Sequence, residues 1–72
     1  MKLFQRDSNA NVIEIGTVTL AGDKLKFSDF KDDGLRKWLQ RGIEFGGELL
    51  TGKSLYDKLP VILRGDRLWA AV

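Results

Sequence analysis

The stretch that decides the fold reads Thr17-Val-Thr-Leu-Ala-Gly-Asp-Lys-Leu-Lys-Phe27. Apolar and polar residues alternate in two runs on either side of Gly22-Asp23, a pair suited to a two-residue turn. We therefore predict a β-hairpin in which Leu20 faces Leu25. Since one face of this hairpin is apolar and the other polar, we expect it to belong to a sheet that is buried on one side only.

The sequence before the hairpin predicts two further strand segments. Ile13 and Ile15 alternate in the opposite phase to the apolar residues of the hairpin, and the phase changes at Gly16. A β-bulge at this point would insert one extra residue and return the apolar side chains to one face. Residues 12–20 are then one bent strand, and residues 3–6 are its antiparallel neighbour.

After the hairpin, the apolar spacing changes to that of a helix. Leu35, Trp38 and Leu39 lie at helical spacing, acidic residues lead and basic residues trail, and Gly42 suits the C-terminal end. The sequence leaves the start of this amphipathic helix open within residues 28–33. We expect the helix to cover the apolar face of the sheet.

Residues 43–50 suggest a second hairpin turning at Gly46-Gly47. Its alternation is imperfect, because Glu44 would then lie opposite Leu49. The sequence alone does not decide between a hairpin and a loop here.

The last third of the chain predicts a helix followed by a terminal strand. Ser54 is the expected N-cap of the helix, and Pro60 is expected either to end or to kink it. Residues 67–72 have the composition of a strand. The order of elements predicts one α+β domain over residues 1–72, with a small antiparallel sheet and one or two short helices.

The composition removes several classes of function. The 72 residues include no Cys and no His, which excludes disulfides, thiol nucleophiles, imidazole bases and the usual zinc and haem ligands. Twelve basic residues against ten acidic residues give a net charge of only +2. No stretch has the length and apolar character of a membrane span or a signal peptide. We expect a cytoplasmic protein with no metal and no cofactor.

Three segments together resemble a group of short bacterial and phage-associated proteins of unknown function. They are VTLAGDKL at 18–25, DGLRKWL at 33–39 and LYDKLPVILRGDRLWA at 55–70. The chain departs from this group at residues 51–54, where the group has a longer acidic helix start. The resemblance implies a compact domain that ends in a strand, and it implies no activity.

Residues 47–54, GELLTGKS, match the phosphate-binding pattern G-x-x-x-x-G-K-[ST]. A working loop of this kind lies between a buried strand and a long helix, whereas Pro60 interrupts the helix here. We expect a Gly-rich connection with an exposed Lys53 and a capping Ser54. Nucleotide or phosphate binding at Gly47 to Ser54 is a further alternative.

Carboxylate chemistry is the one catalytic mode that the composition leaves open. The candidate acids are Glu14, Glu44, Glu48, Asp57 and Asp66. None lies in a distinctive sequence setting, and so short a chain has difficulty forming a catalytic pocket while keeping a core. We expect the protein not to be an enzyme.

The leading hypothesis is a small protein-interaction module that binds itself or another protein. If residues 67–72 lie at a sheet edge, their unpaired backbone groups are available to another strand, and Trp69 is a suitable anchor. The predicted partner-binding residues are Arg64, Arg67, Leu68 and Trp69.

The alternative hypothesis is nucleic-acid binding through a basic rim. The cations that would contact phosphates are Lys24, Lys26, Arg36, Lys37 and Arg41, together with Arg64 and Arg67 near the C-terminus. Trp69 could stack on a base. Such a surface requires these side chains to share one face of the molecule. Acidic residues are interleaved with them nearly one for one, which favours the protein-binding hypothesis.

Overall fold

The computed structural model describes residues 1–71 as six strands and two helices. Their bounds are β1 Lys2–Arg6, β2 Val12–Ala21, β3 Lys24–Ser28, α1 Asp33–Arg41, β4 Ile43–Phe45, β5 Glu48–Leu50, α2 Gly52–Ile62 and β6 Leu68–Ala71. The strands form a four-stranded antiparallel sheet, in the order β3-β2-β1-β6, and a separate β4-β5 pair. The predicted α+β class is confirmed. Val72, at the end of the predicted terminal strand, lies outside the described residues.

The hairpin of β2 and β3 has the predicted register. Leu20 lies opposite Leu25, and Val18 lies opposite Phe27. Gly22 has a φ of 67°, the sign that a type II′ turn requires at its first central position. The alternation of the sequence and the turn residues therefore fix which side chains face the core.

Strand β2 contains the predicted bulge. Leu3 and Phe4 are consecutive on β1, but their partners on β2 are Gly16 and Glu14, so Ile15 is the extra residue. This insertion returns the apolar side chains before and after it to the same sheet face. Ile15 itself is buried in the core.

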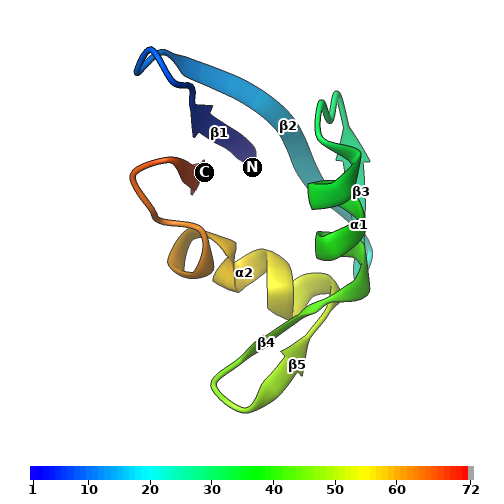
Figure 1. Ribbon diagram of the computed structural model, residues 1–72. Helices are drawn as coiled ribbons and strands as arrows, with labels where there is room; N and C mark the ends of the chain where they lie inside the picture. The colour runs from blue at the N-terminus through cyan, green and yellow to red at the C-terminus, as the bar shows by residue number, and fades with distance from the viewer. Residues whose placement is uncertain (72) are drawn as a thin grey trace.

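The core occupies one face of the four-stranded sheet. Its buried side chains are Leu3, Ile15, Val18, Leu39, Ile43, Leu50, Leu55, Leu59 and Leu63. Helix α2 packs against β2, β3 and β6, and Figure 1 shows it lying across the sheet. Within residues 1–71, neither helix is long and apolar enough to cross a membrane.

The prediction that the first helix covers the sheet is only partly correct. Leu39 of α1 is fully buried and Leu35 packs against the core, but Trp38 is 38% exposed. The main helical cover is α2, because it buries Leu55 and Leu59 one turn apart, whereas α1 fully buries only one side chain.

Two details of α2 differ from the sequence prediction. The N-cap is Thr51, whose side chain makes no capping hydrogen bond, so the prediction of Ser54 as the cap is wrong. Pro60 does not end the helix, which continues to Ile62. Pro60 has no N–H to donate to the Tyr56 carbonyl, but the next turn still closes, because the amide of Leu63 donates to the Leu59 carbonyl at 2.8 Å.

Residues 43–50 form the hairpin that the sequence left undecided. Glu44 does lie opposite Leu49, and Gly46 and Gly47 both have positive φ, as a type I′ turn requires. This hairpin extends away from the main sheet (Figure 1). Leu49 is consequently 63% exposed.

We predict that Gly16→Ala destabilises the protein by about 1–3 kcal/mol. A Cβ at this buried position would lie 2.5 Å from the Phe30 ring, so the ring would have to shift. Chemical denaturation measures the effect. In a Phe30→Leu background the same Gly16→Ala change should cost less, because the ring is absent; an equal cost in both backgrounds would contradict this explanation.

Candidate binding surfaces

The outer edge of β6 is less open than the sequence predicted. The carbonyl of Leu68 accepts a hydrogen bond from the amide of Gly65 at 3.0 Å, and the amide of Ala70 donates to the carbonyl of Leu63 at 2.9 Å. The chain leaving α2 therefore runs alongside β6 and pairs with it. The prediction of an edge with unpaired backbone groups at residues 67–72 is wrong at Leu68 and Ala70.

The predicted partner-binding residues do not form one surface. Leu68 packs against the core, whereas Trp69 alternates with it and points to the opposite sheet face. Arg64 and Arg67 are exposed in the turn before β6, and the carbonyl of Arg67 accepts a hydrogen bond from the amide of Arg6 at 2.9 Å.

Strand β3 forms the other edge of the sheet, and part of its backbone faces away from β2. In an antiparallel pair, alternate residues point their N–H and C=O groups toward the partner strand. Val18 exchanges hydrogen bonds with Met1 on the β1 side, at 2.8 and 2.9 Å. Phe27, which lies opposite Val18, therefore points its N–H and C=O groups away from β2. Leu25 does the same. Within residues 1–71, no hydrogen bond outside the β2 pairing uses these groups.

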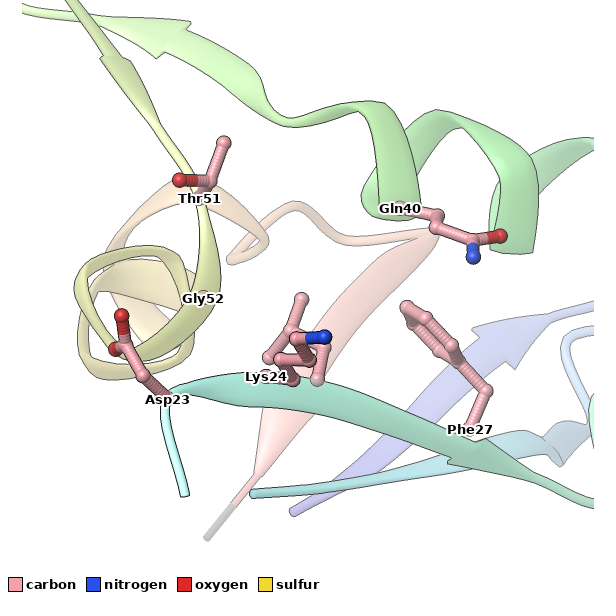
Figure 2. A pocket seen from close by; sticks show the side chains of 7 residues that line it. Asp23, Lys24, Phe27, Gln40, Thr51 and Gly52 are labelled. Carbon is pink, nitrogen blue, oxygen red and sulfur yellow. The ribbon is translucent and has the colours of Figure 1, made fainter. Parts of the chain in front are cut away.

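A groove of about 300 Å³ runs beside this open edge. Its lining residues are Asp23, Lys24, Leu25, Phe27, Gln40, Thr51 and Gly52. Figure 2 shows Phe27 pointing from β3 toward Gln40 of α1, with Thr51 and Gly52 at the start of α2 closing one end. The groove thus joins apolar side chains, a polar rim and an unpaired strand edge.

The cations of the predicted basic rim are divided between two faces. Lys24 and Lys26 alternate with the core-facing side chains of β3, so they point to the sheet face without helices. Helix α1, which packs on the core side of the sheet through Leu39, carries Arg36, Lys37 and Arg41. Arg36 and Lys37 also bond the Asp33 carboxylate, at 2.8 and 3.3 Å, and lower its pKa. The lysines of β3 and the cations of α1 therefore do not form the single surface that this hypothesis requires.

Residues 47–54 do not form a phosphate-binding loop. Glu48 to Leu50 are the strand β5, so their backbone is extended and paired with β4. At the start of α2, the Lys53 amide donates to the Asp23 carboxylate at 3.1 Å. The Lys53 ammonium bonds Asp57 at 2.9 Å, and this contact raises the pKa of Lys53. A carboxylate of the chain itself therefore occupies the position where an anion would bind.

Two of the candidate acids are paired with cations of the chain. Glu14 bonds Lys2 at 3.4 Å, and Asp57 bonds Lys53. Within the described part of the chain, no three acidic side chains gather as a metal site would require.

An aromatic pair on the sheet face without helices was not predicted. Phe4 on β1 lies opposite Trp69 on β6, and their rings stack with 5.9 Å between centroids. The sequence carries part of the signal, because Lys2, Phe4 and Arg6 alternate with the buried Leu3. The pairing with Trp69 required knowledge that the first and last strands are neighbours.

Comparison of this chain with protein families, with curated proteins and with solved structures gives no match. The function must therefore be inferred from the β3 edge with its groove and from the sheet face that carries Phe4 and Trp69.

We predict that Asp23→Ala destabilises the protein by about 1 kcal/mol, because the Lys53 amide at the start of α2 loses its acceptor. Ser54→Ala is the matched control and should change the free energy of unfolding very little, since Ser54 lies inside the helix. Asp23→Asn, which keeps an acceptor oxygen, should recover much of the loss. Denaturant titration of the three variants checks this order, and a larger cost for Ser54→Ala would contradict it.

Proposed function

We propose that this protein is a non-catalytic protein-interaction module that binds an extended segment of another protein along β3. The observation that supports this proposal is the unpaired outer edge at Leu25 and Phe27, next to a groove. Outward N–H and C=O groups of an edge strand bind the backbone of an added strand, and neighbouring pockets select alternate side chains. The corresponding groups of β6 are already paired at two residues.

The two faces of β3 indicate the chemistry of this partner. Side chains of an added strand that point inward would enter the groove and contact Leu25 and Phe27, which favours apolar residues. Side chains that point outward would lie beside Lys24 and Lys26, which form no ion pair within residues 1–71. The favoured partner is therefore a segment in which apolar and acidic residues alternate.

A second copy of the chain fits this edge less well. Antiparallel pairing of two β3 strands would bring Lys24 and Lys26 of both copies close together on one face. Like charges on neighbouring strands destabilise their pairing, and lysines on edge strands commonly prevent self-association. This charge pattern favours another protein over self-association.

The test is peptide binding to the Leu25→Pro variant. Proline removes one outward N–H and blocks strand addition, but it is tolerated at edge positions because that N–H does not pair with β2. The probe is a fluorescent peptide in which valine and glutamate alternate. Its length of about ten residues is at the upper end of usual strand lengths. We expect saturable binding by the natural protein, at least about tenfold weaker binding by Leu25→Pro, and weaker binding by Lys26→Gln.

Controls separate docking from general effects. Lys58→Gln removes an exposed cation of α2 and should leave peptide affinity unchanged. Circular dichroism establishes that each variant is folded. Equal peptide affinity of the natural protein and Leu25→Pro would overturn the proposal, and so would the absence of binding. If sedimentation shows that the natural protein is a dimer and that the Leu25→Pro variant is a monomer, this edge binds a second copy instead.

A further inference from the structure

The sheet face opposite the helices carries a line of aromatic and cationic side chains. The Phe4 and Trp69 rings stack at an interplanar angle of 25°, and the Arg6 guanidinium lies 5.4 Å from the centroid of the Trp69 ring. All three residues come from the adjacent strands β1 and β6, and both aromatic rings are only half-buried. No helix of residues 1–71 covers this side of the sheet, because both helices contribute to the core on the other side.

A second hollow continues this line. It has a volume of about 330 Å³ and is lined by Met1, Lys2, Phe4 and Ala71. Along the strands the order is Arg6, then Phe4 opposite Trp69, then Lys2 opposite Ala71. The hollow therefore lies on the side of Phe4 away from Arg6, where a flat ring entering it would lie next to the Phe4 ring.

The charge of this face favours a polyanion. The outward-pointing ionisable residues of its four strands are Lys2, Arg6, Lys24, Lys26 and Glu14. Four cations thus stand against one carboxylate, which is paired with Lys2 at 3.4 Å. The outward positions between them include Thr17 and Thr19, which add hydrogen-bonding hydroxyl groups without negative charge.

We propose that this face binds single-stranded nucleic acid. A base enters the hollow beside Phe4, neighbouring bases stack along the aromatic pair, and backbone phosphates contact Lys2 and Arg6. Stacking on aromatic side chains combined with a cationic path for phosphates is the usual chemistry of single-strand recognition. Rings in a sheet surface reach unstacked bases and not those inside a duplex. This binding activity goes beyond peptide docking. It centres on β1 and β6 and shares only Lys24 and Lys26 with the peptide surface along β3.

Trp69 supplies a spectroscopic probe for this proposal. Trp38→Phe leaves Trp69 as the only tryptophan, and Trp38 lies on α1, away from this face. The titrants are oligothymidylate and oligouridylate of about ten nucleotides, within the range that small single-strand-binding folds cover. We expect saturable quenching of Trp69 fluorescence at about 50 mM salt and a steep loss of affinity toward about 200 mM. Comparison of the two affinities shows whether the face prefers single-stranded DNA or RNA.

Variants separate stacking from charge. Phe4→Leu should weaken binding about tenfold, because a stacking ring is lost. Arg6→Gln should weaken binding and reduce the slope of log affinity against log salt by about 0.7, the value for one phosphate on a single strand. Lys58→Gln, on the helical side, should change neither quantity. Circular dichroism and the thermal transition establish that each variant is folded.

Four results would overturn the proposal. They are the absence of quenching by both oligonucleotides, equal affinity for a duplex, unchanged affinity of Phe4→Leu, and equal quenching by polyglutamate. Polyglutamate carries negative charge but no bases, so that last result would assign the face to acidic proteins instead. Saturable binding of a single strand that depends on Phe4 and Arg6 would establish the proposal.

Discussion

The extra residue of β2 is the feature on which the rest of the structure depends. Ile13 and Ile15 alternate in the opposite phase to Val18 and Leu20, so an uninterrupted strand would direct half of these side chains into water. The bulge at Ile15 brings them to one face, and the lack of a side chain at Gly16 leaves room for the Phe30 ring. The amide of Lys31 then donates to the Ile15 carbonyl at 2.9 Å, which ties the segment after β3 to the bulge.

This single apolar face determines where the helices lie and what remains uncovered. Leu39 from α1 and Leu55 and Leu59 from α2 belong to the same buried core as Leu3, so both helices pack on one side of the sheet. Within residues 1–71, no further helix or strand covers the second side of the sheet. The sheet thus presents an open face and, at β3, an open edge. Lysines occupy both places, and this charge supports the proposals of acidic or phosphate-bearing partners over strand pairing between copies.

Local patterns predicted the parts of the fold that neighbouring residues determine. The turn at Gly22-Asp23 and the flanking alternation gave the register of β2 and β3, and the change of phase at Gly16 gave the bulge. These predictions succeeded because the register of the hairpin and the position of the bulge depend on residues that are close together in the sequence. The prediction of the cap at the start of α2 failed for the opposite reason. The side chain that accepts from the Lys53 amide is that of Asp23, which lies 30 residues away in the sequence.

The candidate surfaces depended even more on contacts between distant segments. The pairing of Leu63 with Ala70 closes the edge that the sequence had indicated as open, and it arises only because the chain turns back after α2. The stack of Phe4 on Trp69 joins residues at opposite ends of the chain. Alternation places each of these rings on the outward face of its own strand, but it does not show that the two strands are neighbours.

Hydrogen exchange of individual backbone amides measures most directly whether one edge of the sheet is closed and the other open. The amide of Lys26 pairs with β2 and that of Ala70 with Leu63, so both should exchange slowly, whereas Leu25 and Phe27 should exchange much faster. This alternation along β3, together with a protected Ala70, is the expected result. Equal protection of Leu25, Lys26 and Phe27, or rapid exchange at Ala70, would contradict it.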